Sequence, residues 1–360
     1  MKKNVPINKG NYNSMEAPER IALFEKHRGE GWEEEYKAYR ERWEMQPKQY
    51  IVGDYPVQVD IEISNVCNLN CPMCFRGKEE YKEKYKDKLL MNFELFKKII
   101  DEIGKKVPAV RLSLRGESTL HPKMIECIKY AKEKGIKEVS FLTNGSKLTK
   151  DYFKEIMLAG ADWITISVDG TEKTYESIRK PLKFKETLER IKKINEIKQQ
   201  YNYHKPVIKI QSIWPAIKDN PEEFFNIFAP YVDLIAFNPL IDYLANDDEK
   251  NIIFIEGFSC PQHYQRLVIG ADGMALMCTN DEENTQFIGD ANKQSIHEIW
   301  NGERLNKIRE LHKKKNGFKK IPVCKACFLP RKTESIETGC VNGRVFTIEN
   351  YINRTQEIGK

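Results

Sequence analysis

The sequence lacks any uninterrupted run of about 18 apolar residues, the length that a membrane-spanning helix needs. It also lacks an apolar segment behind the two lysines of its opening stretch MKKNVPINKGNYNS, which a secretory signal peptide would have. We therefore expect a cytoplasmic protein with no membrane partner. Hydrophobic residues make up 40% and charged residues 31%, proportions typical of a globular chain.

Concentrated blocks of basic residues are missing as well. The 59 lysines and arginines exceed the 53 acidic residues by only six, and this excess is spread along stretches of mixed Lys and Glu. Nucleic-acid-binding proteins gather such charge in a patch, so we expect no nucleic-acid partner. A small acidic partner protein and an ordinary solvated surface are both compatible with this charge.

Nine cysteines are present in a chain that is expected in a reducing compartment, where metal binding and catalysis are more frequent than disulfides. Three lie in CNLNCPMC (67–74), Cys127 stands alone, and five follow residue 259. The isolated Cys127, within MIECIKYAKEKG, is expected to be a buried small residue. The two groups predict two separate sites.

Short β-branched runs alternate with amphipathic stretches from residue 57 onward. We expect strands at 57–63, 110–114, 138–142, 163–168, 207–213 and 234–238, and helices at about 92–104, 121–135, 149–160, 184–200 and 220–230. This alternation predicts an α/β fold with a parallel sheet and right-handed crossovers. Six units, fewer than the eight of a closed barrel, predict a partial (β/α)6 barrel of parallel strands.

Three parts of the chain are expected. Residues 1–50 form a helical N-terminal extension, split into two helices by Gly29 and Gly31, that packs over the main domain. Residues 51–240 form the partial barrel. Residues 241–360 form a small α+β domain, with a boundary near 240–258, a hairpin at 266–278 that turns at 271–273, and a helix at about 295–313.

Polar residues follow the predicted strands at the edge where ligands bind in parallel βα sheets. The three-cysteine loop follows the first strand, RGES (115–118) the second and TNG (143–145) the third, while Ser167, Asp169, Gln211 and Asn238 end the remaining three. Three thiolates hold three irons of a [4Fe–4S] cluster and leave the fourth iron open to a small molecule. A zinc site completed by a distant ligand such as His121 is the alternative.

The C-x3-C-x2-C spacing, with the acidic GE after the second strand, resembles the radical S-adenosylmethionine enzymes over about residues 57–240. The resemblance implies that Cys67, Cys71 and Cys74 hold the cluster and that S-adenosylmethionine chelates the open iron. It also implies that the following residues contact the cofactor: Met73, Gly116, Glu117, Asn144 and Ser167. Arg179, in YESIRKP, is a further candidate cofactor-binding residue that would bind a carboxylate, and closing a helix is its alternative role. In this chain Met73 replaces a usual aromatic residue. RGES replaces the usual GGEP, which places Arg115, a candidate catalytic residue, near the pocket mouth.

The later cysteines resemble the SPASM or shorter twitch extension of these enzymes over about residues 258–330. The resemblance implies one auxiliary [4Fe–4S] cluster with Cys260, Cys278, Cys324 and Cys327 as ligands, because the later cysteines of a full SPASM domain are missing. One alternative is Cys324, Cys327 and Cys340 around an open iron that binds substrate. A structural zinc is the other.

A fully ligated auxiliary cluster suits a substrate radical that must lose an electron. The leading hypothesis is an oxidoreductase that converts a secondary alcohol of a small sugar, cyclitol or similar substrate to a ketone, with a flavodoxin or ferredoxin as electron donor. A radical epimerase of a sugar or aminoglycoside, with Cys340 as catalytic hydrogen donor, is the second. A ribosomal peptide maturase and a non-catalytic metal-binding scaffold are further alternatives.

Overall fold

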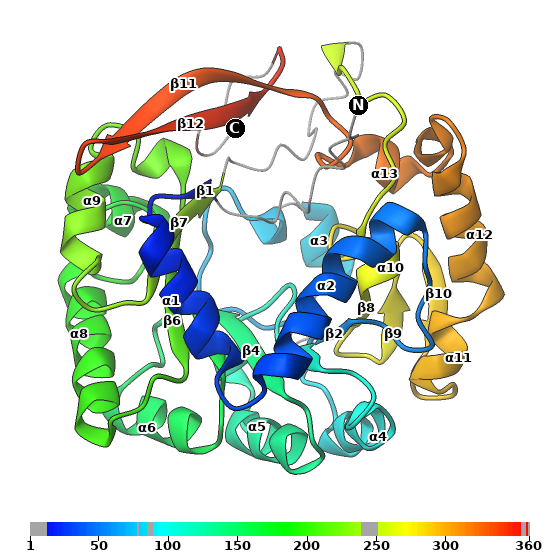
Figure 1. Ribbon diagram of the computed structural model, residues 1–360, viewed down its shortest axis with the longest axis horizontal. Coiled ribbons are helices and arrows are strands. Elements are labelled where there is room, and N and C mark those ends of the chain that lie inside the picture. Colours follow the sequence, from blue (N-terminus) through cyan, green and yellow to red (C-terminus); the bar gives the residue numbers. More distant parts are fainter. Residues whose placement is uncertain (1–12, 78, 85–88, 239–250, 354–357, 359–360) are drawn as a thin grey trace.

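One ten-stranded sheet organises the protein. The structure is a computed structural model that describes residues 13–77, 79–84, 89–238, 251–353 and 358. The strand order is β1-β7-β6-β5-β4-β3-β2-β8-β9-β10, and β2 to β7 run parallel as an open barrel wall (Figure 1). The predicted α/β class and partial barrel of six parallel strands are confirmed.

The six barrel strands and the five predicted helices between them all form, within a few residues of the expected bounds. The strands are β2 (Gln58–Ile61), β3 (Ala109–Arg111), β4 (Glu138–Thr143), β5 (Trp163–Ser167), β6 (Val207–Ile213) and β7 (Leu234–Asn238). The predicted helices are α4 (Phe93–Ile103), α5 (Met124–Glu133), α6 (Lys150–Leu158), α8 (Phe184–Tyr201) and α9 (Pro221–Phe228). The short helices α3 (Glu79–Lys84) and α7 (Glu172–Ile178) were not predicted.

Local sequence signals set several of these helix ends. The side chain of Asn92 accepts a hydrogen bond from the amide of Glu94 at 2.7 Å and so caps α4. Gly135 and Gly160 follow α5 and α6 with φ angles of 94° and 96°, which residues with a Cβ rarely adopt. The barrel helices lie outside the strands, and α4 buries Phe96, Ile99, Ile100 and Ile103 (Figure 1).

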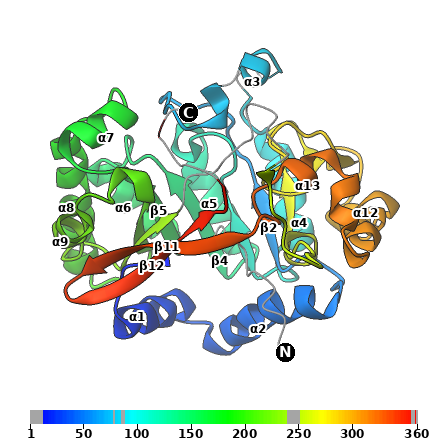
Figure 2. The same ribbon diagram turned by 90° about the horizontal axis from the view of Figure 1, so that it is seen from above.

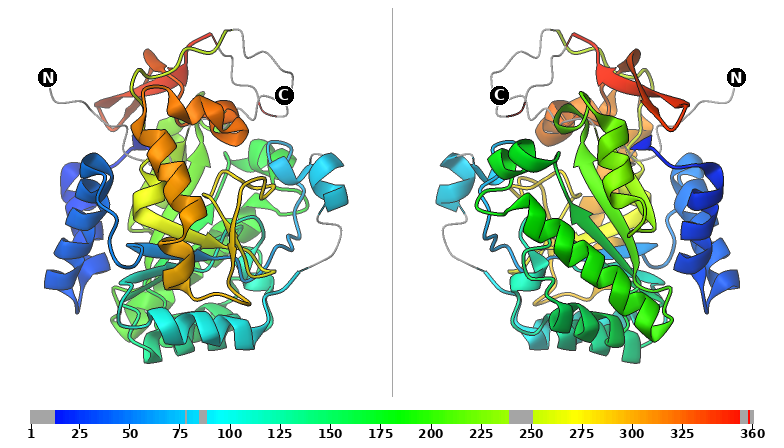
Figure 3. Two further views of the ribbon diagram at one scale, coloured as in Figure 1. Left: turned by 90° about the vertical axis from the view of Figure 1, so that its right-hand side faces the viewer. Right: turned by 90° about the vertical axis from the view of Figure 1, so that its left-hand side faces the viewer.

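The N-terminal extension closes the end of the barrel where the strands begin. Helices α1 (Pro18–Gly29) and α2 (Glu33–Gln49) lie together on one side of the sheet (Figure 3). Aromatic side chains of α2 pack with Val57 and Ala109, and Phe24 of α1 packs with Val207 and Leu234. Arg28 forms a buried ion pair with Glu138, the first residue of β4, at 2.6 Å. The predicted pair of helices, separated near Gly29 and Gly31, is therefore present.

The C-terminal region continues the barrel sheet. β8 (Arg266–Ile269) runs parallel beside β2, and β9 (Met274–Leu276) returns antiparallel, so the predicted hairpin is confirmed. Gly273 has the positive φ angle, 83°, that this turn needs. β10 (Phe287–Asp290) completes this edge. Part of the predicted boundary near 240–258 lies outside the described residues.

The predicted helix at 295–313 is two helices, α11 (Ile296–Trp300) and α12 (Glu303–Lys313), because Gly302 between them has an extended backbone. Helices α10 (Gln262–Gln265) and α13 (Pro322–Ala326) flank them. Two further elements were not predicted. β1 (Asn13–Ser14) pairs with β7, and β11 (Thr333–Val341) with β12 (Arg344–Tyr351) forms a separate hairpin that extends from α9 across the molecule (Figure 2). No helix in the described ranges is both long and apolar enough to cross a bilayer.

Candidate functional site

The C-terminal ends of the barrel strands surround a pocket of about 290 Å³, the cysteine-loop pocket. All of the residues that the sequence assigned to the first cluster and its cofactor line this pocket: Cys67, Cys71, Met73, Cys74, Gly116, Glu117, Asn144, Ser167 and Arg179. The candidate catalytic residue Arg115 lines it as well. They come from loops after four strands, so the fold brings them together as expected for a parallel sheet. The individual role of each residue stays a prediction.

The three thiols of the loop form a donor set that suits iron. Cys71 is buried and Cys67 and Cys74 are half-buried. Burial raises the pKa of the Cys71 thiol to about 11 and also raises the pKa of Cys74, so a bound metal must displace protons from them. His121, the zinc alternative, does not join them: its Nε2 lies 3.0 Å from the carbonyl of Met91, and its Nδ1 accepts from the amide of Lys123.

Glu117 braces the loops that surround this pocket. Its carboxylate accepts hydrogen bonds from Thr143 Oγ1 and from the amide of Asn144, both at 2.7 Å. The amide of Glu117 donates to the carbonyl of Val66 at 2.7 Å, next to Cys67. Gly116 is required here because a Cβ would overlap the backbone of residues 64–66. The RGES turn therefore packs directly on the cysteine loop.

Arg115 has a different position from the expected pocket mouth. Its side chain is buried, and its Nε donates to Glu62 Oε1 at 2.8 Å, immediately after β2. Another guanidinium nitrogen donates to the carbonyl of Glu282 at 3.0 Å. The buried carboxylate of Glu62 thus draws the guanidinium into the wall of the pocket.

The second cysteine group forms its own pocket, the auxiliary pocket, between α10, the end of β9, α12 and α13. Cys260, Cys278, Cys324 and Cys327 all line it, with apolar neighbours that include Phe258, Met277, Val323 and Leu329. Burial raises the pKa of Cys260 to about 12 and that of Cys327 to about 11. Four thiols around one pocket fit a fully ligated [4Fe–4S] cluster.

Two histidines that the sequence did not single out also line the auxiliary pocket. His312 Nε2 lies 3.5 Å from Cys324 Sγ, and its Nδ1 accepts from the amide of Cys260 at 3.2 Å. Burial lowers the pKa of His312 to about 4 and that of His263 far below its usual value, so both rings are neutral. Their spacing from the cysteines follows no motif, and only the fold places them here.

Cys340 and Cys127 lie apart from both cysteine groups. Cys340 is exposed on β11, opposite Val345, and is not among the described residues that line either pocket. Its catalytic role stays a prediction. Cys127 belongs to α5 and is buried in the core, as the sequence predicted.

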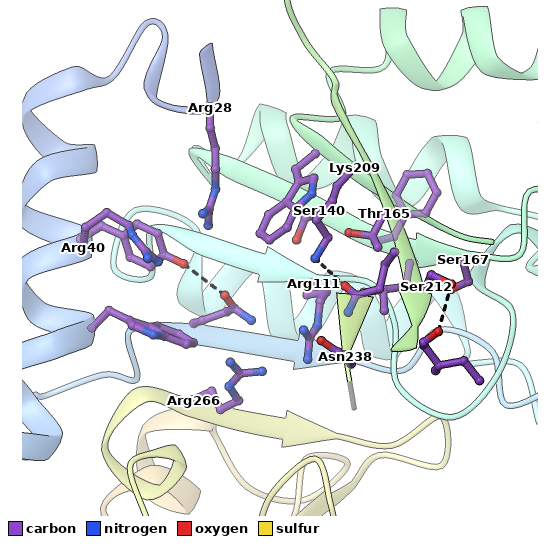
Figure 4. A pocket seen from close by; sticks show the side chains of 18 of the residues that line it. Arg28, Arg40, Arg111, Ser140, Thr165, Ser167, Lys209, Ser212, Asn238 and Arg266 are labelled. Atoms are coloured by element: carbon purple, nitrogen blue, oxygen red, sulfur yellow. Dashed lines mark hydrogen bonds between the residues drawn. The ribbon is translucent and has the colours of Figure 1, made fainter. Parts of the chain in front are cut away.

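A third pocket, the lumen pocket, has a volume of about 380 Å³ and fills the interior of the barrel (Figure 4). It adjoins the cysteine-loop pocket, since Leu142, Ser167, Arg179, Ile213 and Asn238 line both. The sequence analysis missed its charged residues, of which the main ones are Arg28, Arg111, Lys209 and Arg266. One signal was available in the sequence. Arg111 and Lys209 are charged residues within the otherwise apolar strands β3 and β6, and alternate side chains of a barrel strand point into the barrel.

Comparisons with known proteins agree with this geometry. Residues 61–223 match the Radical SAM superfamily, and residues 260–328 match the SPASM iron-sulfur cluster-binding domain. The chain is 26% identical to the tungsten-containing aldehyde ferredoxin oxidoreductase cofactor-modifying protein of Pyrococcus furiosus over 70% of this chain and 71% of that protein. It is 30% identical to the "Probable GTP 3',8-cyclase" of Saccharolobus islandicus over 65% of this chain and 77% of that protein.

A solved structure shares the fold. BtrN in complex with AdoMet and 2-DOIA superimposes with a TM-score of 0.51 and 15% identity, covering 77% of this chain and 94% of that chain. The three-cysteine loop, the auxiliary pocket and both sequence matches lead to one conclusion. The chain belongs to the Radical SAM superfamily and carries a C-terminal SPASM iron–sulfur cluster-binding domain, with [4Fe–4S] clusters and S-adenosylmethionine as its cofactors.

Proposed function

We propose that the protein oxidises a secondary alcohol of a small hydroxylated molecule, such as a sugar or cyclitol, to a ketone. The observation that carries the proposal is the convergence of Cys260, Cys278, Cys324 and Cys327 on one auxiliary pocket, while Cys340 lies outside it. Four thiolates occupy all four irons of a cluster and leave none open to substrate. Such a cluster is suited to accept an electron.

When bound, the cofactors supply a 5′-deoxyadenosyl radical and an electron acceptor. The chain's own residues provide the surroundings. Cys67, Cys71 and Cys74 would hold the first cluster, and Glu117 holds the loops of Asn144 and Thr143 beside it. Helices α1 and α2 cover the far end of the barrel and would limit the access of water to a substrate in the lumen pocket.

The atoms and electrons of this oxidation balance. The carbinol carbon would give a hydrogen atom to the radical that S-adenosylmethionine supplies, with 5′-deoxyadenosine as the by-product. The hydroxyl would release its proton to the medium, the cluster that Cys260, Cys278, Cys324 and Cys327 would hold would accept one electron, and the carbon–oxygen bond would become a carbonyl. A flavodoxin or ferredoxin would supply the electron that begins the reaction.

The test is anaerobic incubation of the reconstituted protein with reductant, S-adenosylmethionine and a panel of sugars and cyclitols deuterated at the alcohol carbon. We expect a ketone product and deuterium in 5′-deoxyadenosine. Cys278→Ala should still cleave S-adenosylmethionine but form little ketone. Cys127→Ala removes a buried cysteine outside both groups and should retain both activities. Ketone formation by Cys278→Ala at the wild-type rate would contradict the proposal.

The same experiment separates the alternatives. An epimerase would release no ketone and would incorporate solvent deuterium into the product. Ring formation on a nucleotide, as the name of the Saccharolobus islandicus relative describes, is favoured by the 30% identity. A cyclisation that relies on an open iron held by Cys340 has little support, because Cys340 is exposed on β11. Adding GTP to the panel tests that reaction directly.

A further inference from the structure

Three cations from separate strands face the same space in the lumen pocket. Arg111 of β3, Lys209 of β6 and Arg266 of β8 all line it, and the latter two are buried (Figure 4). Lys209 Nζ donates to Gln211 Oε1 at 2.6 Å and lies 5.2 Å from the centre of the Trp163 ring. The guanidinium of Arg266 lies 4.7 Å from the ring centre of Trp43, which α2 contributes to the pocket wall.

One carboxylate serves two of these cations. Asp60 Oδ2 accepts from Arg111 at 2.6 Å and from Arg266 at 3.0 Å. Elsewhere in this wall the cations have carboxylates of their own: Arg28 pairs with Glu138 and also with Glu25, and Arg179 pairs with Asp169. The Asp60 group therefore holds two positive charges against one negative charge. A buried excess of positive charge lowers the stability of the folded protein, and a bound anion would reduce this cost.

Lys209 lies in the same positive field. Burial lowers its pKa well below that of an ordinary lysine, and the positive charges of Arg111 and Arg28 lower it further. The pKa of Arg266 is also lowered, by burial and by Arg111, against the opposite effect of Asp60. An anion placed between these groups would reverse these effects.

Buried hydrogen-bond donors in this wall lack acceptors. Among the described residues that line the lumen pocket, four buried donor atoms have no hydrogen-bond partner: Arg111 Nε, Arg266 Nε, Gln211 Nε2 and Trp163 Nε1. Among the described residues of this pocket, one buried acceptor atom also lacks a hydrogen-bond partner, Asn238 Oδ1. Buried donors without partners are costly, and a group rich in oxygen lone pairs would satisfy several at once.

We propose that the lumen pocket binds the negatively charged end of the substrate, a phosphate or carboxylate group, through Arg111, Lys209 and Arg266. The inference rests on the proposed function, whose substrate class it narrows to hydroxylated anions. Lys209 Nζ lies beside Gln211 Oε1, and Gln211 is two residues from Ile213 on β6, about 7 Å along the strand. Ile213 lines both pockets, so a small molecule whose anion binds at Lys209 would extend toward the cysteine-loop pocket.

The test measures anion binding without turnover. Reconstituted protein with S-adenosylmethionine is dialysed to equilibrium against radiolabelled inorganic phosphate or acetate at constant ionic strength. We expect at least one of them to saturate a single site per chain. Tighter binding of phosphate identifies a phosphorylated substrate, and tighter binding of acetate identifies a carboxylate.

Three variants locate the site. Lys209→Met removes a buried charge together with its hydrogen bond to Gln211 and should weaken binding at least about tenfold. Arg111→Gln should also weaken anion binding, because it removes a different cation of the same site. It keeps the proposal testable if Lys209→Met folds poorly. Lys293→Met removes a positive charge from a side chain that is 84% exposed and should bind like wild type.

Failure of both anions to saturate a site would overturn the proposal, as would unchanged binding in both Lys209→Met and Arg111→Gln. A different result would refute the proposed oxidation. If the protein binds an anion but forms no ketone from any member of the substrate panel, the oxidation is wrong and the anion site still stands.

Discussion

Arg115 and Glu62 form a buried ion pair that connects the two cluster-binding regions. Arg115 Nε lies 2.8 Å from Glu62 Oε1, and the same guanidinium binds the carbonyl of Glu282. Glu62 Oε2 accepts from the amide of Ala271 at 3.1 Å, in the turn between β8 and β9. The turn that lines the cysteine-loop pocket is therefore tied to the C-terminal region through one carboxylate.

Breaking this pair is expected to destabilise the protein strongly. Arg115→Met leaves the Glu62 carboxylate buried without its guanidinium, which costs about 3–5 kcal/mol of unfolding free energy. Anaerobic urea denaturation measures the change. Arg304→Met, at an exposed arginine, is the control. A loss for Arg115→Met below about 1 kcal/mol, the usual value for a surface pair, would show that the pair does not hold the regions together.

Iron content tests the two ligand sets. Anaerobically reconstituted protein should hold about eight irons, as two [4Fe–4S] clusters. The Cys67, Cys71 and Cys74 triple alanine variant should retain about four. Cys340→Ala should retain all of its iron, because Cys340 is exposed on β11, and Cys278→Ala should lose the auxiliary iron. Loss in Cys340→Ala together with retention in Cys278→Ala would overturn the auxiliary ligand set.

Glu117→Ala should weaken the binding of S-adenosylmethionine at least about tenfold, because charge-assisted hydrogen bonds that hold Asn144 and Thr143 are lost. The iron content should stay nearly unchanged, since Glu117 is not a predicted ligand. Equilibrium dialysis with labelled S-adenosylmethionine measures the effect, with the exposed Glu126→Ala as the matched control. Normal binding by Glu117→Ala would remove the RGES turn from the cofactor site.

Lys209→Met should stabilise the protein in the absence of substrate. The folded-state pKa of Lys209 lies well below the usual 10.5, so burial of this amine opposes folding at pH values below 10.5. Below the folded-state pKa the cost is about 1.4 kcal/mol for each unit by which the pKa is lowered. The gain should be largest below the folded-state pKa and should vanish as the pH rises toward 10.5. Thermal unfolding of both proteins at pH 7 and pH 10 measures it. An equal difference at both pH values would contradict the assignment.

The sequence was a good guide to the barrel because its signals are local. Alternating strands and helices, the glycines after α5 and α6, and the turn at Gly273 each lie within a few residues of the feature they determine. The break at Gly302 was missed because a single glycine does not by itself end a helical pattern. The hairpin β11–β12 was also missed, although its turn at Asn342-Gly343, with φ angles of 49° and 74°, is the two-residue motif typical of hairpins. Arg115 was misplaced because its partner Glu62 is 53 residues away.

The sequence by itself pointed to the cysteine chemistry, because the three predicted ligands of the first cluster lie in one loop of eight residues and their spacing does not depend on how the rest of the chain folds. Only the tertiary structure decided that Arg111, Lys209 and Arg266 share one pocket and that Cys340 stands apart from the other late cysteines. The physical reason is that the neighbours in a sheet are chosen by strand order. β8 pairs with β2 across about two hundred residues of chain, and no local pattern encodes that pairing.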